Sequence, residues 1–205
     1  SPGRLNGQPP HAAPRAAPGA AATPMSNHTV SHVHSLPALC GPALLQVLSP
    51  MSVEPVSSSL LVLQNVLDSM PPVRAMQLRL EGYADGQLQL TAPLAVNVND
   101  KGNAFGGSLA SAMTLSGWAL VTLRLRLAGF EAEVYVADSQ LRYRAPVYGD
   151  LHAQARIDPD SDWETFLATF KQRGKARIGV VAVQPGTDGK PAAELSGRFV
   201  AFAKG

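Results

Sequence analysis

Apolar residues recur with two different periods after residue 50. Positions 59–68 repeat at helical spacing, which predicts a helix that the prolines at 71–72 end. The segment 76–81 alternates apolar and polar residues, an Asp-Gly turn follows at 85–86, and 88–91 alternates back. The pattern therefore predicts a helix followed by a β-hairpin.

The longest apolar segment runs from Ala104 to about Leu127, and its stretch 104–123 has no charged residue. A helix there has no polar face, so we expect it to be buried nearly all round. A charge-free stretch of this length also matches a membrane span. Several glycines and serines dilute its hydrophobicity, however, and the surrounding hairpins are typical of a soluble protein. We therefore expect no membrane span.

Further strands are expected at 133–144, 151–157, 176–183 and 193–203, where apolar positions alternate or cluster. A short amphipathic helix is expected at 163–170, between the second and third of these strands. One long helix embedded between hairpin strands predicts an α+β fold, in which an antiparallel sheet wraps around the central helix.

Composition narrows the possible functions. The 205 residues are 45% hydrophobic, which suffices for a core, and a net charge of +2 gives no support for a nucleic-acid binder. The single cysteine, Cys40, excludes an internal disulfide framework and a cysteine-based metal cluster, and we expect no metal site. A reducing, cytoplasmic location is the expectation that follows.

Residues 1–50 differ in kind from the remainder. They begin with a stretch rich in Ala, Pro and Gly, and no acidic residue occurs before Glu54. Such a segment buries too little apolar surface to offset the entropy of ordering it. We therefore expect a disordered tail at 1–50 and one domain at 51–205. An alternative is that translation begins at Met25 or Met51 and that the upstream residues are not native protein.

The segment 99–109, Asn-Asp-Lys-Gly-Asn-Ala-Phe-Gly-Gly-Ser-Leu, carries the strongest sign of chemistry. A polar loop delivers two adjacent glycines, Gly106 and Gly107, to the start of the long helix. Glycine lets a ligand approach the backbone closely, and the amides of a helix's first turn have no partner within the helix. This layout is typical of an oxyanion hole.

From Val53 onward the chain resembles the hotdog-fold thioesterase superfamily, most closely the YiiD C-terminal domain family. The resemblance covers about three quarters of the chain. It implies a hotdog fold that forms homodimers or dimers of dimers, with active sites at the subunit interface. The motifs that carry it are Asn99-Asp100-Lys101-Gly102-x-Ala104-Phe105-Gly106-Gly107-Ser108-Leu109, Arg142-Tyr143-x-x-Pro146-Val147-x-Gly149-Asp150 and Arg173-Gly174-Lys175-Ala176-Arg177.

Related acyl-CoA thioesterases of this fold carry Asn-x-x-Gly-x-x-His-Gly-Gly and then an acidic residue two helical turns later. In this chain Phe105 stands at the His position and Thr114 at the acid position. The residues implied to be catalytic are Asn99, Gly106, Gly107 and Thr114, and those implied to line the substrate site are Phe105 and Ser108.

Each polar candidate has a structural alternative. Thr114 lies seven residues after Gly107, so on a helix both face the same way about 10 Å apart. Its hydroxyl either meets a thioester held at the glycines or bonds to a backbone carbonyl. Asn99 is either a substrate donor or a loop residue bonded to its own backbone. Asp100 is the nearest carboxylate, either a general base or a loop cap.

The residue inventory bears on the reaction. Hydrolysis needs a base or a nucleophile, and the helix offers only hydroxyl groups without a partner. Decarboxylation of a malonyl thioester needs only hydrogen bonds that polarise the carbonyl. Proteins similar to this one are linked to malonyl-acyl-carrier-protein decarboxylation, which supplies acetyl groups for starting fatty-acid synthesis. We therefore favour decarboxylation, with thioester hydrolysis and a non-catalytic acyl-binding module as alternatives.

Basic residues offer contacts for the substrate and its carrier. Arg142 is a candidate partner for a substrate carboxylate. Arg173, Lys175 and Arg177 are candidates for docking an acidic acyl carrier protein or the phosphates of coenzyme A, although such a cluster is most often a solvated face. No cofactor is expected beyond coenzyme A or phosphopantetheine as part of the substrate.

Overall fold

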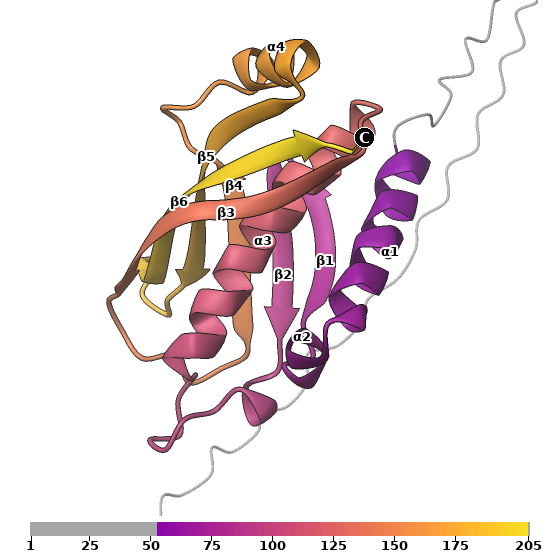
Figure 1. Ribbon diagram of the computed structural model, residues 1–205. Coiled ribbons are helices and arrows are strands. Elements are labelled where there is room, and N and C mark those ends of the chain that lie inside the picture. Colours follow the sequence, from indigo (N-terminus) through magenta and orange to yellow (C-terminus); the bar gives the residue numbers. More distant parts are fainter. Residues whose placement is uncertain (1–52, 205) are drawn as a thin grey trace, which may run out of the picture. The chain divides into compact units, whose positions relative to one another are not determined.

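The computed structural model describes residues 53–204, so the tail expected at 1–50 and its boundary lie outside the described residues. Helices and strands alternate along this part of the chain (Figure 1). In order they are α1 (Val53–Ser69), α2 (Pro71–Ala75), β1 (Arg79–Ala84), β2 (Gln87–Ala92), the 3-10 helix η1 (Leu94–Val96), α3 (Gly106–Leu127), β3 (Ala132–Tyr143), β4 (Leu151–Ile157), α4 (Trp163–Arg173), β5 (Lys175–Pro185) and β6 (Pro191–Ala203).

The six strands form one antiparallel sheet in the order β1-β2-β4-β5-β6-β3. Helix α3 packs across one face of this sheet and contacts every strand except β1 closely, while α1 lies beside α3 (Figure 1). The prediction of an α+β fold with an antiparallel sheet around a long helix is confirmed.

Strand alternation explains how α3 is enclosed. In β4 the buried positions Leu151, Ala153 and Ala155 alternate with polar ones, so one face of the strand packs on the helix. The helix approaches the sheet closely at Gly117, where an added Cβ would lie 2.7 Å from Cζ of the buried Phe199. A side chain at this position would force the helix and the sheet apart.

Helix α3 is less completely enclosed than its sequence predicts. Most of its residues are buried, but one stripe is only half-buried because α1 and the edge strand β3 leave that side open. The stripe includes Gly107, Ser111, Thr114, Trp118 and Thr122, which follow one another at helical spacing. None of the helices in the described range 53–204 is long and apolar enough to cross a membrane.

Two local predictions need correction. The prolines at 71–72 do not merely end α1, because they also begin the short helix α2, where the first turn tolerates proline. The first strand was expected at 76–81 but begins at Arg79, since Gln77 has a positive φ of 55° and cannot continue a strand. The Asp-Gly hairpin turn at 85–86 is confirmed, with φ of 50° and 75°.

Candidate functional site

A buried asparagine that no motif indicated fixes the loop before α3. Asn97 is 2% exposed, and its side-chain nitrogen donates to the carbonyl oxygens of Met76 at 2.9 Å and Pro93 at 2.8 Å. The amide of Phe105 donates to the carbonyl of Asn97 at 2.7 Å. Asn97 therefore sets the point at which the chain enters α3.

Asn99 uses its side chain inside the same loop. Its nitrogen donates to the side-chain oxygen of Asn103 at 2.9 Å, and its oxygen accepts from the amides of Lys101 at 2.8 Å and Asn103 at 3.3 Å. These bonds stabilise the turn at Gly102, whose φ is 76°. The geometry favours the loop-bonded alternative over a free substrate donor.

The candidate base Asp100 lies on the surface of this loop. Its carboxylate is 79% exposed and accepts hydrogen bonds from the ammonium of Lys101 at 2.9 and 3.0 Å. In the described structure it bonds to no group of α3. The structure therefore does not bring Asp100 to the glycines.

The first turn of α3 has free amides. Phe105 is the N-cap residue, its side chain makes no cap hydrogen bond, and the first turn contains no acidic residue. The first amide bonded back to the cap is that of Leu109, which donates to the carbonyl of Phe105 at 3.1 Å. Within the described residues, the N–H groups of Gly106, Gly107 and Ser108 have no acceptor. Three donors at the positive end of a helix dipole are thus free to bind a carbonyl or an anion.

Two aromatic rings flank the two glycines. The Tyr143 hydroxyl donates to the carbonyl of Gly106 at 2.7 Å, and its ring lies 3.4 Å from the place where a Cβ on Gly106 would stand. The Phe105 ring covers Gly107 so closely that a Cβ there would collide with it. Burial raises the pKa of Tyr143 above its usual 10.0, so the hydroxyl stays protonated and donates. The sequence analysis did not assign a role to Tyr143.

The hydroxyl of Thr114 is unbonded, unlike those of two neighbours in the same helix. Ser116 donates to the carbonyl of Met113 at 2.8 Å, and Thr122 donates to that of Trp118 at 2.8 Å. Thr114 makes no such bond in the described structure and lies half-buried on the open stripe of α3. The structural alternative for Thr114, a hydroxyl bonded back to a carbonyl, is therefore not realised.

The interior around α3 offers no general base. Among the described residues, the buried polar side chains are Asn97, Ser108, Ser116 and Gln184, with no acidic residue and no histidine. His152 is exposed, and its backbone amide donates to the Gln184 side chain at 2.7 Å. No group of three or more potential metal ligands occurs in the described range.

The remaining candidates lie apart from the glycines within one copy of the chain. Arg142 is on the outer face of the sheet, opposite Glu194, whereas its neighbour Tyr143 faces α3. Lys175 pairs with Phe202, which pairs with Glu133 at the start of β3. The end of β3 that contacts Gly106 is roughly 33 Å farther along that strand.

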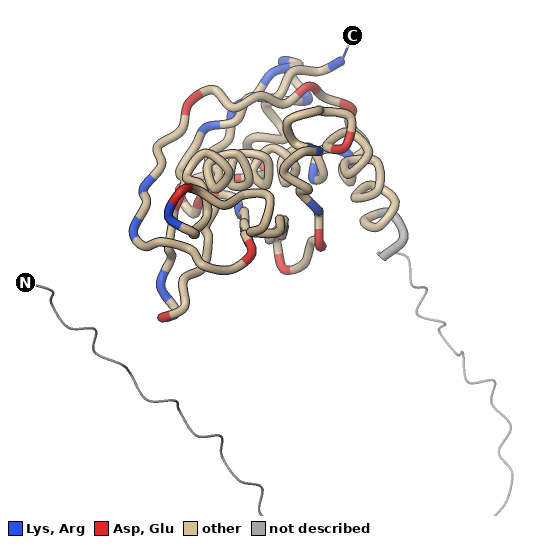
Figure 2. The backbone as a smooth tube through the Cα atoms, turned by 90° about the horizontal axis from the view of Figure 1, so that it is seen from below, with Lys and Arg blue, Asp and Glu red and all other residues tan. Residues whose placement is uncertain are grey.

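The charges of the described chain are spread around its periphery rather than gathered beside the start of α3 (Figure 2). At that end Lys101 pairs with Asp100, and Arg144 pairs with Glu194. The exposed side chains there include Phe105, Tyr143 and Tyr148. One copy of the chain therefore presents the free amides in neutral, aromatic surroundings.

Comparison with known proteins gives a consistent picture. The model of the family described as "Putative thioesterase (yiiD_Cterm)" matches residues 60–203. A solved structure of a protein of unknown function from Chlorobaculum tepidum is 30% identical, with a TM-score of 0.65, over 72% of this chain and 95% of its own. A "putative thioesterase" from Shewanella oneidensis is 32% identical, with a TM-score of 0.63, over 71% of this chain and 99% of its own. A "Probable Thioesterase" from Pseudomonas aeruginosa, 24% identical over 70% of this chain and 95% of its own, has a TM-score of 0.57 and supports the fold alone.

Proposed function

This chain belongs to the thioesterase family of the YiiD C-terminal domain, and from that premise we propose that it acts on acyl thioesters at the start of α3. The amides of Gly106 and Gly107 are proposed to hold the thioester carbonyl oxygen, with Ser108 as a third donor. The observation that carries this proposal is the set of unbonded amides at an uncapped helix start.

Thr114 is proposed to act with these amides. It lies on the same open stripe as Gly107, about 10 Å farther along the helix, and its hydroxyl is free. A substrate whose carbonyl lies at the glycines extends toward it. Asn99 is proposed to act indirectly, by holding the loop that presents Phe105 and the glycines.

The preferred reaction is decarboxylation of a malonyl thioester, carried by acyl carrier protein or by coenzyme A. The bond between the α-carbon and the carboxylate breaks, carbon dioxide leaves, and the electron pair forms an enolate whose oxygen the free amides stabilise. The α-carbon then takes a proton from solvent, giving the acetyl thioester. This sequence needs no general base, which agrees with the lack of buried acidic residues and histidines in the described chain.

Hydrolysis is the second candidate, because the family and its relative from Shewanella oneidensis carry the description of thioesterases. Water attack on a thioester needs a base, and Asp100 is the nearest carboxylate in the loop. Its exposure and its pairing with Lys101 make it a poor candidate in this geometry.

A homodimer is part of the proposal. Strand β3 is twelve residues long, stands at the edge of the sheet and exposes Tyr135 and Val136. Two such edges that pair antiparallel form one continuous sheet and remove an exposed edge. This pairing places the start of β3 in one copy against its end in the other. It therefore brings Lys175 and Arg177 of one copy toward the Gly106 end of the other, where they are proposed to contact the carrier together with Arg173.

Product analysis tests the proposed function. The protein is incubated with malonyl, acetyl and longer acyl thioesters on coenzyme A and on acyl carrier protein, and the products are identified by mass. Acetyl thioester formed from malonyl thioester supports decarboxylation, and free thiol supports hydrolysis. Binding without turnover of any substrate contradicts both reactions and leaves an acyl-binding module.

A further inference from the structure

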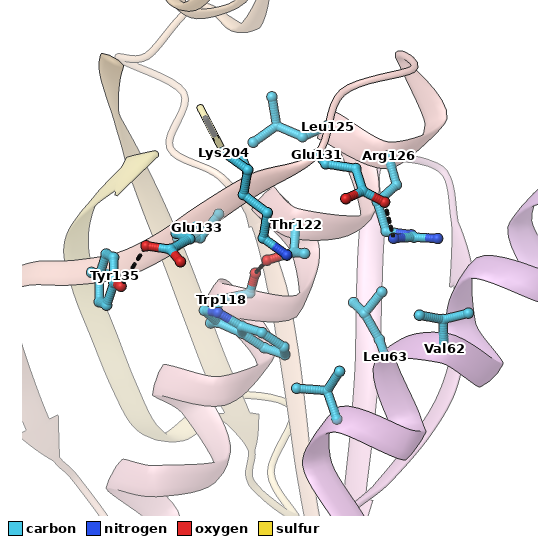
Figure 3. A pocket seen from close by; sticks show the side chains of 13 residues that line it. Val62, Leu63, Trp118, Thr122, Leu125, Arg126, Glu131, Glu133, Tyr135 and Lys204 are labelled. Carbon is cyan, nitrogen blue, oxygen red and sulfur yellow. Dashed lines mark hydrogen bonds and ion pairs between the residues drawn. The ribbon is translucent and has the colours of Figure 1, made fainter. Parts of the chain in front are cut away.

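A cavity of about 290 Å³ lies at the other end of α3, between α1, the helix itself and the start of β3 (Figure 3). Most of its wall is apolar. The apolar lining residues are Val62, Leu63, Val66, Trp118, Leu125, Ala132 and Val134. Trp118 also belongs to the open stripe of α3, one turn beyond Thr114.

Charged side chains occupy one side of this cavity. Glu131 lies 3.9 Å from a terminal nitrogen of Arg126, and Glu133 accepts a hydrogen bond from the Tyr135 hydroxyl at 2.9 Å. Lys204 extends over the cavity toward Thr122 (Figure 3), and its ammonium has no ion pair within the described residues. The two carboxylates therefore have partners, whereas one cation has none.

Arg126 adds an unsatisfied donor to the same wall. Its Nε is buried and has no hydrogen-bond acceptor in the structure. A buried donor without an acceptor loses its hydration and gains nothing in return, so an acceptor bound beside it is favoured. A free ammonium and an orphaned guanidinium N–H next to an apolar wall fit one ligand chemistry.

We propose that this cavity binds a carboxylate amphiphile, that is, a monocarboxylate with a hydrocarbon chain such as a free fatty acid. The chain packs against Trp118 and the residues of α1, and the carboxylate faces Lys204 and Arg126. A cationic headgroup is repelled by the same two residues, and a short dicarboxylate leaves the apolar wall uncovered. The proposal goes beyond the reaction at Gly106 and does not depend on it.

The two tryptophans of the chain allow a direct binding test. Trp118 lines the cavity, whereas Trp163 lies in α4 with the Arg124 guanidinium 4.1 Å from its ring centre. In a Trp163→Phe variant of the full chain, all tryptophan emission comes from Trp118. We expect decanoate to shift this emission saturably, and decan-1-ol and decylamine to bind at least tenfold more weakly. Equal binding of all three compounds, or an unchanged emission at saturating decanoate, overturns the proposal.

Charge variants locate the headgroup. In the Trp163→Phe background, Lys204→Gln is expected to weaken decanoate binding about tenfold, the size of losing one hydrogen bond to a charged group, and to leave decan-1-ol unchanged. Lys190→Gln, at an exposed lysine before β6, is the matched control and is expected to change neither. Because Lys204 is exposed, its replacement leaves the fold intact. Unchanged decanoate affinity in Lys204→Gln, or an equal loss in Lys190→Gln, contradicts the assignment.

Discussion

Two helices of this domain begin in opposite ways. At the start of α4, the Asp162 carboxylate accepts a hydrogen bond from the amide of Thr165 at 2.7 Å, and Glu164 places further negative charge in the first turn. At the start of α3, Phe105 has no oxygen to offer, two glycines follow, and the first turn contains no acidic residue.

The difference concerns what each helix end is for. Capping satisfies orphan amides and favours the helix, as does an acidic first turn. Helix α3 lacks both features, and glycine at two successive helical positions lowers its stability further. An end that forgoes this stabilisation keeps its amides available to a ligand. We therefore interpret the start of α4 as structural and the start of α3 as the binding site.

The largest expected effect concerns the hydroxyl that extends the open end. Thr114→Val keeps the shape of the side chain but removes the donor, so turnover is expected to fall roughly a hundredfold, as for loss of one oxyanion-type donor. Thr114→Ser retains the hydroxyl and is expected to keep much of the rate. Steady-state kinetics on the substrate identified by product analysis measures both. Equal rates in the Val and Ser variants remove Thr114 from the site.

Closing the open end makes the two helices alike. Phe105→Asp places a carboxylate where it accepts from the free amides of α3, so we expect a more stable fold and roughly a tenfold or greater loss of turnover. Phe105→Ala removes the ring without supplying a cap and serves as the control. Thermal denaturation and kinetics are measured together. A Phe105→Asp protein that is as active as Phe105→Ala shows that the amides are not needed.

Opening the capped end is expected to affect stability alone. Asp162→Ala removes the acceptor for the Thr165 amide, and a melting temperature lower by a few degrees is expected, with turnover unchanged. Differential scanning calorimetry and an activity assay check this. A loss of activity without a loss of stability contradicts the structural role given to α4.

The smallest expected effect is a pH dependence at the same cap. Hydrogen bonds from the side chain and backbone of Thr165 lower the pKa of Asp162 below its usual 3.8. A carboxylate with a lowered folded pKa stabilises the fold above the unfolded value and loses this effect as the pH falls through the folded value. The difference in melting temperature between the unaltered protein and Asp162→Asn is therefore expected to shrink below pH 3.8. A difference that does not change with pH contradicts this cause.

The sequence predicts most of the fold because its signals are local. The apolar run beginning at Ala104, the Asp85-Gly86 turn and the alternation in 151–157 each specify one element without reference to distant residues. The first strand was misplaced because Gln77 adopts a left-handed conformation that its residue type does not indicate. The exposure of one stripe of α3 depends on the position of β3 at the sheet edge, which periodicity does not reveal.

The site is predicted less completely because its contacts are long-range. The glycines and Thr114 could be found from one motif, whereas the bond between the Tyr143 hydroxyl and Gly106 joins residues 37 apart in sequence. Arg142 was a reasonable candidate by charge, but strand alternation turns it to the outer face. The cavity beside Trp118 brings α1, β3 and Lys204 together, which only the folded sheet does.

The central claim is that the free amides at the start of α3 bind the reacting carbonyl, and one pair of variants tests it most directly. Gly106 is the first helical residue and Phe105 before it is extended, so Gly106→Pro fits the backbone while removing the N–H. Gly106→Ala adds a similar Cβ beside the Tyr143 ring and keeps the N–H, which makes it the control. The account predicts that turnover falls roughly a hundredfold in the proline variant and stays near that of the unaltered protein in the alanine variant. Equal turnover in two folded variants contradicts it.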